Sequence, residues 1–81
     1  MTITVLLFAS FADAAGWTES VFDLSGEPTV QDVWDRVIAH TPALSRWPKP
    51  SLVARNREYT KLSTPLSNGD EVAFLPPIAG G

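Results

Sequence analysis

The chain of 81 residues contains no cysteine, so neither a disulfide nor a thiolate metal site can support its core. It has a single histidine, His40, and therefore no pair of imidazoles with the spacing of a metal site. No glycine-rich loop leads from a predicted strand into a helix, as a phosphate-binding loop would require. We expect His40 to be a polar group near a helix C-terminus rather than a catalyst.

Basic residues are absent before Arg36, whereas residues 1–35 carry six acidic residues. A signal peptide requires a basic N-terminal region, so the apolar start of the chain is not predicted to be one. All six basic residues lie within 36–61, where Glu58 is the one acid. This split indicates either two solvated faces of opposite charge or a means of orienting a charged partner. The net charge of −3 argues against nucleic acid as a partner.

The apolar run at 3–9 is far too short to span a bilayer, which argues against a membrane partner. A composition of 44% hydrophobic and 19% charged residues is typical of a globular protein. We therefore expect a single domain over residues 1–81, located in the cytoplasm.

Two continuous apolar runs, at 3–9 and 71–77, are typical of strands covered on both faces. We predict that they are neighbours in the middle of one sheet. A short helical turn is expected to follow the first run and to end at Gly16. Residues 18–24 indicate an outer strand. "LVARN" at 52–56 is predicted to be a further strand, followed by a tight turn.

The segment after Thr29 has the pattern of an amphipathic helix. Thr29 is a suitable N-cap, with Asp32 three residues later as a capping-box partner. Helical spacing places five residues on one apolar stripe: Val30, Val33, Trp34, Val37 and Ile38. The helix should end at Thr41, because Pro42 follows it, and Leu44 and Trp47 should cap the core. The predicted architecture is α+β, with one helix on one face of a sheet and the other face partly exposed.

The last segment, "FLPPIAGG", is apolar, then rigid, then without side chains. Pro76 and Pro77 fix their φ angles and should project the following residues outward. Gly80 and Gly81 have no Cβ and would fit a tunnel too narrow for other residues. The group that such a tail presents is the carboxylate of Gly81, which must be activated, for example by adenylation, before it can react as an acyl donor.

The final "GDEVAFLPPIAGG" resembles the C-terminal signature of molybdopterin synthase small subunits, the MoaD-type sulfur carriers. "VLLFASFADAAG", "PTVQDVWDRV" and "LVARNREY" are similar to other parts of the same family. The resemblance covers nearly the whole chain. It implies the ubiquitin-like β-grasp fold: a mixed sheet, one main helix on one face, and a projecting tail at 76–81.

The resemblance also implies a mechanism. An adenylating activating enzyme would use ATP on the Gly81 carboxylate, and a sulfur donor protein would convert it to a thiocarboxylate. The synthase large subunit would then receive the tail and use the sulfur to build the dithiolene of molybdopterin. The chain itself would bind no cofactor and no metal, and catalytic residues would lie in the large subunit.

Carried over residue by residue, the resemblance implies that Gly80 and Gly81 are the functional end of the tail. The expected partner contacts are Phe8, Tyr59, Leu75, Pro76, Pro77, Ile78 and Ala79. Two positions depart from the family pattern. Leu75 replaces a frequent aromatic residue, and Arg55 stands within "ARN" where "AVN" is common. The Arg55 departure bears on the fit to the partner.

Two alternative functions remain. The first is a sulfur carrier for another product, such as thiazole or cysteine. The second is a protein modifier that is joined through Gly81 to lysines of a partner, or simply an interaction module.

Overall fold

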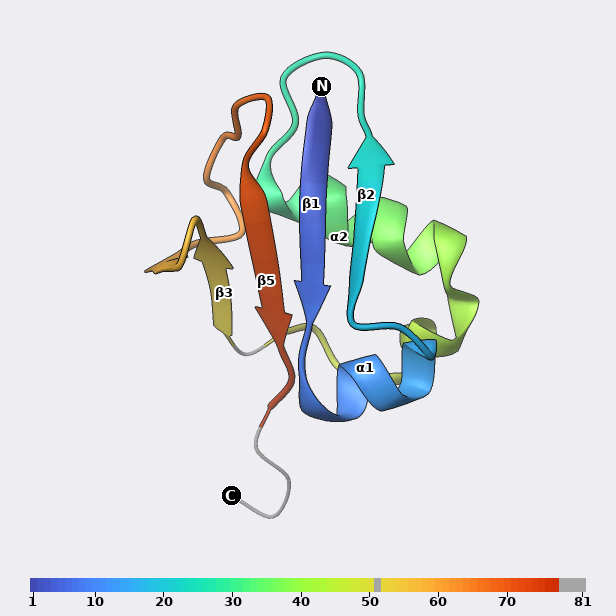
Figure 1. Cartoon of the computed structure of the whole chain (residues 1–81). Coiled ribbons are helices and arrows are strands. Elements are labelled where there is room, and N and C mark those ends of the chain that lie inside the picture. The colour runs from blue at the N-terminus through green and yellow to red at the C-terminus, as the bar shows by residue number, and fades with distance from the viewer. Residues whose placement is uncertain (51, 78–81) are drawn as a thin grey trace.

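The two apolar runs at opposite ends of the sequence form neighbouring parallel strands in the computed structural model, which describes residues 1–50 and 52–77 (Figure 1). Strand β1 covers Thr2–Leu7 and β5 covers Glu71–Leu75. Val5 lies opposite Val72 in their shared register. The prediction that these runs are neighbours within the sheet is confirmed.

Three shorter strands complete a five-stranded mixed sheet of order β2-β1-β5-β3-β4. Strand β2 (Glu19–Asp23) is antiparallel to β1, β3 (Leu52–Arg55) is antiparallel to β5, and β4 (Glu58–Thr60) is antiparallel to β3. The expected tight turn joins β3 to β4, with φ of 50° at Asn56 and 72° at Arg57. Two consecutive positive φ angles are favoured in such hairpins because they match the twist of the strands.

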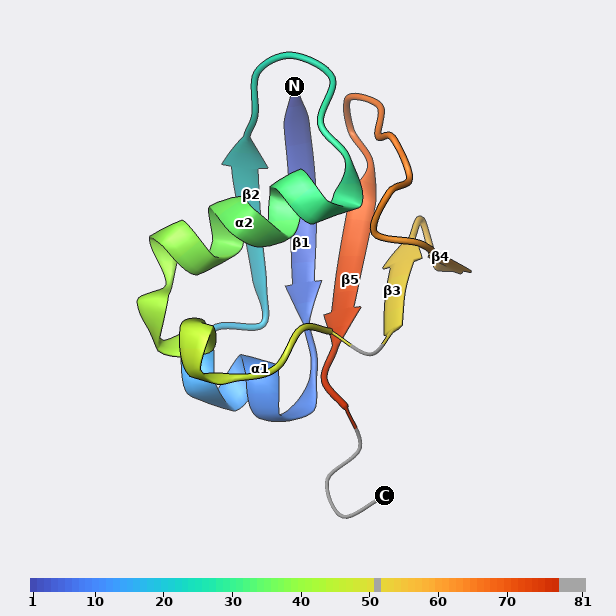
Figure 2. The same ribbon diagram turned by 180° about the vertical axis from the view of Figure 1, so that it is seen from behind.

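Helix α2 (Val30–His40) crosses one face of the sheet, as Figure 2 shows. It begins with a capping box, in which the Thr29 hydroxyl accepts a hydrogen bond from the Asp32 N–H and the Asp32 carboxylate accepts one from the Thr29 N–H. Its buried residues are Val30, Val33, Trp34 and Val37, with Ile38 half-buried beside them. The helix ends at Thr41, so its predicted start, stripe and end are all confirmed.

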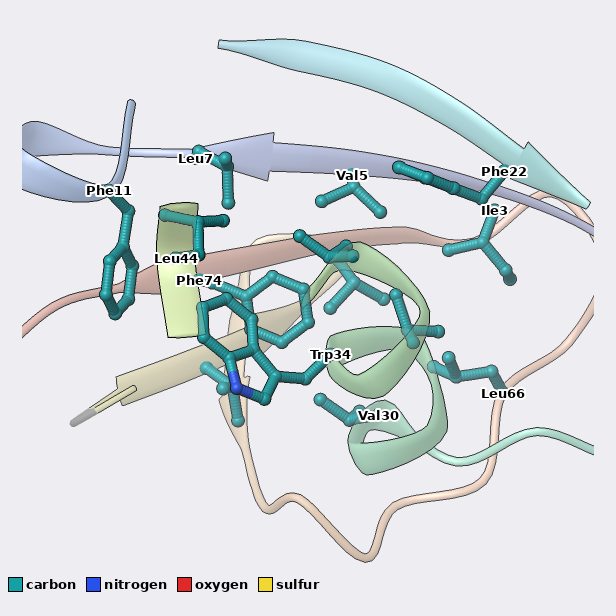
Figure 3. Close-up of a cluster of buried hydrophobic side chains, with 14 residues drawn as sticks. Ile3, Val5, Leu7, Phe11, Phe22, Val30, Trp34, Leu44, Leu66 and Phe74 are labelled. Atoms are coloured by element: carbon teal, nitrogen blue, oxygen red, sulfur yellow. The ribbon is translucent and has the colours of Figure 1, made fainter. Parts of the chain in front are cut away.

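Aromatic rings fill the space between α2 and the sheet (Figure 3). The ring centroids of Trp34 and Phe74 are 4.9 Å apart, and those of Trp34 and Phe11 are 5.1 Å apart. Leu44 is fully buried and caps this core as predicted. Trp47 lies edge-on to Phe11 at 6.4 Å but stays 40% exposed, so it covers the core only in part.

Two short helices lie at the end of the sheet where β5 ends (Figures 1 and 2). Helix α1 (Ala9–Ala15) ends at Gly16, whose φ of 81° is readily adopted by glycine, and this confirms the expected helical turn. The 3₁₀ helix η1 (Pro42–Arg46) was expected to be a loop. Pro42 suits the first turn of a helix because the N–H that proline lacks has no intrahelical partner there. Within residues 1–50 and 52–77, no helix has the length and apolarity needed to cross a membrane.

The sheet has one covered face and one open face. The side chains of Ile3, Val5, Leu7, Val72 and Phe74 lie under α2 and are at most 2% exposed. The alternate residues of these strands point to the opposite face. No element in the described part of the chain covers that face, which is turned to the viewer in Figure 1. The predicted partly exposed face is confirmed. The expectation that β1 and β5 are covered on both faces is wrong, because this small domain provides a helical layer on one side alone.

Candidate functional site

A row of paired residues crosses the open face from one edge of the sheet to the other. In order from β2 to β4, the row contains Glu19, Leu6, Ala73, Ala54 and Tyr59. The two alanines are small, so the sheet surface is lowered between Leu6 and Tyr59. A hollow of about 490 Å³ results, and we call it the open-face hollow. Its apolar lining is Leu6, Phe8, Ala54, Tyr59, Ala73 and Leu75.

Phe8, Tyr59 and Leu75 line the open-face hollow together, although they come from three separate parts of the sequence. Tyr59 is 73% exposed and Phe8 is 44% exposed. Exposed aromatic side chains grouped around a hollow are typical of a protein interaction surface, since a partner can bury them. The structure thus places these three residues on one surface, while their contact with a large subunit remains a prediction.

The C-terminal segment leaves the sheet directly from this hollow. Leu75 is both the last residue of β5 and a lining residue of the hollow. Pro76 follows it half-buried and Pro77 is exposed. The remaining predicted tail residues, which are Ile78, Ala79, Gly80 and Gly81, lie outside the described residues, so the predictions about them stay predictions.

Sequence reasoning did not identify Leu6, Ala54 and Ala73 as part of this surface. A signal for two of them was present: Leu6 in β1 and Ala73 in β5 are apolar residues that alternate with core residues, whereas the chain has one main helix to cover one side of these strands. Leu6 and Ala73 therefore follow from strand alternation. Strand alternation alone does not predict that Ala54 belongs to this surface, because its position in the row depends on the pairing of β3 with both β5 and β4.

Three charged residues complete the lining of the hollow: Glu19, Arg57 and Glu71. The Arg57 Nε lies 3.8 Å from Glu71 Oε1, and the Arg57 side chain is 89% exposed. An ion pair so long and so exposed contributes little stability. Within residues 1–50 and 52–77, Glu19 forms no ion pair. The hollow is thus an apolar floor with charges at its rim.

Arg55, one of the departures from the family pattern, is tied to a buried carboxylate instead of lining the hollow. Its Nε donates to Asp70 Oδ2 at 2.7 Å, and Asp70 is 7% exposed. Asp70 also accepts hydrogen bonds from the Ser67 N–H at 2.8 Å and from Asn56 Nδ2 at 3.0 Å. Burial by itself would raise the pKa of Asp70, but these hydrogen bonds and the Arg55 charge together lower it. The network fastens the β3–β4 hairpin to the start of β5.

The described residues offer little for catalysis. Among residues 1–50 and 52–77, no group of three or more His, Cys, Asp or Glu side chains could hold a metal ion. His40 is in the last turn of α2, as expected, and its exposed ring lies edge-to-face on Phe22 with centroids 5.3 Å apart. The most distinctive feature of the described residues is therefore the exposed apolar lining of the open-face hollow beside the end of β5.

Comparisons with known proteins agree with this geometry. The ThiS family model matches residues 5–81. The molybdopterin synthase sulfur carrier subunit of Chlamydomonas reinhardtii is 39% identical over the full length of both chains. Small archaeal modifier protein 1 of Haloferax volcanii is 34% identical over 93% of this chain and 95% of its own. A crystal structure of that protein superposes with a TM-score of 0.86 over the whole of both chains.

A more distant structure shows the same fold within an assembly. In a protein–protein complex of subunits 1 and 2 of the molybdopterin-converting factor from Helicobacter pylori, one chain superposes with a TM-score of 0.67 at 22% identity, over the whole of both chains. At that identity the similarity establishes the fold alone. The full-length matches confirm the resemblance seen in the sequence, and the chain belongs to the ThiS/MoaD family of sulfur carriers with the ubiquitin-like β-grasp fold.

Proposed function

We propose that this chain is the sulfur carrier subunit of a molybdopterin synthase. The observation that carries the proposal is the position of the open-face hollow, whose lining residue Leu75 is followed directly by Pro76 and the tail. A partner that covered the hollow would therefore receive the tail at the edge of the same contact. The full-length similarity to the sulfur carrier subunit of Chlamydomonas reinhardtii supports the choice of pathway.

The proposed chemistry begins at the carboxylate of Gly81. An activating enzyme joins this carboxylate to the AMP portion of ATP, and pyrophosphate leaves. A sulfur donor protein then supplies sulfur, which forms a bond to the Gly81 carbonyl carbon as AMP leaves. The product is a thiocarboxylate. The chain has no cysteine, so the sulfur must come from outside.

In the second stage, the large subunit accepts the tail and transfers the sulfur to a cyclic pyranopterin monophosphate. Water supplies the oxygen that replaces the transferred sulfur at the Gly81 carbonyl carbon, so Gly81 returns to a carboxylate and can be charged again. A dithiolene contains two sulfur atoms, so two charged carriers serve each pterin, consistent with a heterotetramer of two small and two large subunits. The small subunit presents the sulfur, and the large subunit provides the catalytic residues.

The decisive experiment combines the purified chain with its activating enzyme, ATP and sulfide, followed by mass spectrometry of the intact protein. We expect the mass increase of one oxygen replaced by sulfur, located at Gly81. The charged protein is then mixed with the large subunit and cyclic pyranopterin monophosphate, and molybdopterin is measured. A carrier for thiazole or cysteine synthesis would acquire the same thiocarboxylate but give no molybdopterin, and this would refute the proposed pathway.

A second candidate function is that of a protein modifier, favoured by the similarity to small archaeal modifier protein 1 of Haloferax volcanii. A modifier would leave Gly81 in an amide bond with a lysine of another protein, whereas the carrier is released with a free end. Immunoblots of tagged protein from the native host, with mass spectrometry of its C-terminus, distinguish the two. We expect unconjugated protein, and a ladder of larger species with Gly81 linked to lysine would favour the modifier.

A further inference from the structure

The separation of charge seen along the sequence becomes a separation across the open face. Glu19 lies on β2, at one edge of the sheet. Arg57 lies in the turn between β3 and β4, at the opposite edge. Both line the open-face hollow, and the apolar floor lies between the two strand edges. Glu19 therefore makes one side of the hollow acidic, and Arg57 places a positive charge at the opposite side, where Glu71 lies 3.8 Å from it.

Both charged groups are available to a partner. Glu19 is exposed and, within residues 1–50 and 52–77, forms no ion pair. The guanidinium of Arg57 is 3.8 Å from one oxygen of Glu71, which is too long for a charge-assisted hydrogen bond. Its donors can therefore pair with a carboxylate of a partner without first breaking a strong internal contact.

The backbone holds Arg57 at the rim in a defined position. Its φ of 72° is unusual for a residue with a side chain and persists only where neighbouring contacts support it. Asn56 supplies that support, because its N–H donates to the Glu71 carbonyl at 2.8 Å and its Oδ1 accepts from the Glu71 N–H at 2.9 Å. The backbone from which the Arg57 side chain extends is thus fixed at this edge.

We infer that the open face admits its partner in one orientation, with a basic group of the partner opposite Glu19 and an acidic group opposite Arg57. The inference rests on the proposed function and takes the synthase large subunit as the partner. An apolar hollow attracts a partner without regard to direction, because hydrophobic contact is not directional. Charges of opposite sign at its two sides supply the direction. Direction matters because the tail after Leu75 leaves from one end of the face.

The test is a charge swap that keeps the net charge constant. Glu19→Lys and Arg57→Glu together leave the net charge at −3, so any effect comes from the arrangement of charges and not their total. The matched control is the exposed pair Glu27→Lys and Arg46→Glu, which also keeps −3 and does not line the hollow. Affinity and association rate for the purified large subunit are measured by surface plasmon resonance at low and high salt.

We expect the swap to weaken binding about tenfold at low salt, mainly through slower association, and to weaken it less at high salt. Each single change should weaken binding by about two- to fivefold, the range for exposed ion pairs. The control pair should bind as the wild type does. If the swapped chain does not fold, as judged by circular dichroism, the neutral pair Glu19→Gln and Arg57→Gln replaces it and should lose the salt dependence.

The outcomes separate this inference from the proposed function. Wild-type binding with an unchanged swap variant overturns the inference and leaves the proposed function standing. A control pair that weakens binding as much as the swap also overturns it, because the effect would then not belong to the hollow. Failure of the wild-type chain to bind the large subunit overturns both.

Discussion

The last two residues of strand β5, Phe74 and Leu75, are both large and apolar but lie on opposite faces of the sheet. Phe74 points under α2, is fully buried and contacts Trp34. Leu75, the next residue, points to the open face and is half-exposed. Burial of the first stabilises the fold of this chain, whereas the second belongs to the surface that we propose for docking. A strand that is apolar on both faces, in a domain with one helical layer, therefore indicates a docking surface as well as a core.

The comparison also extends to polar groups. On the covered side, Asp70 is satisfied by three hydrogen bonds from its own chain. On the open side, Glu19 and Arg57 have weak internal contacts or none among the described residues. The carboxylate that holds the fold is paired by short hydrogen bonds, whereas the rim of the hollow has one long, exposed ion pair, between Arg57 and Glu71.

The largest effect is expected on sulfur transfer and should come from changes to the tail, which belongs to neither face of the sheet. Deletion of Gly81, or addition of one residue after it, is expected to abolish sulfur transfer because the reacting carboxylate is lost or displaced. The melting temperature should not change. Molybdopterin formation and thermal unfolding are measured in parallel. Full conversion by the extended chain, with its end unprocessed, would contradict this role of Gly81.

The next largest effect is expected on the free energy of unfolding, which should depend on which face of β5 is changed. Phe74→Ala is expected to lower the free energy of unfolding by about 3–5 kcal/mol, since it leaves a cavity beside Trp34. Leu75→Ala, one residue away, should change it by less than about 1 kcal/mol, because the side chain is half-exposed. Urea unfolding followed by tryptophan fluorescence measures both. Equal losses for the two variants would show that the faces do not differ in this way.

A third prediction tests the open face by measuring binding to the large subunit instead of stability. Leu75→Glu or Phe8→Glu should weaken affinity for the large subunit by about 2 kcal/mol, roughly thirtyfold, because a carboxylate would be desolvated in the contact. Val21→Glu is the control, since Val21 is 59% exposed on the same sheet but does not line the hollow. Isothermal titration calorimetry gives the affinities. Unchanged binding by both variants, with folding verified, would exclude the hollow as the docking site.

The smallest effect is expected on stability and should come from the buried carboxylate of Asp70. The pKa of Asp70 is lowered in the folded chain, so its charged form contributes stability above its unfolded pKa and loses that contribution as the pH falls through the folded pKa. Asp70→Asn should therefore cost about 1–2 kcal/mol at neutral pH, and less in acid once the pH has fallen below the lowered pKa of Asp70. Urea unfolding at the two pH values measures this difference. A cost that is the same at both would show that the carboxylate charge does not matter.

Much of the fold was predictable because its signals are local. Thr29 and Asp32 are three residues apart and form the expected capping box, and Gly16 ends α1 as its conformational freedom suggests. The helix η1 was missed, because a proline-rich segment reads as a loop unless its contacts with α1 and α2 are known. Local signals define where elements begin and end, and they say less about short helices that depend on packing.

The lining of the open-face hollow was predictable in part, but its shape was not. Phe8, Tyr59 and Leu75 were identified through family resemblance, and strand alternation alone would have added Leu6 and Ala73. Nothing in the sequence showed that Ala54 and Ala73 would be adjacent, which creates the hollow. The contact of Arg55 with Asp70 was equally hidden, since it joins residues 15 positions apart.

The sequence by itself determined the types of the main elements, the apolar stripe of α2, the charge separation and the diproline before the last residues. These features can be read along the chain without knowing which distant segments come into contact. Only the tertiary structure decided which face of β1 and β5 stays open, and that Glu19 and Arg57 stand on opposite sides of one hollow. The physical reason is that strand order and register arise from pairing between distant segments, such as Leu6 with Ala73, and cooperative packing, not local preference, selects those pairs.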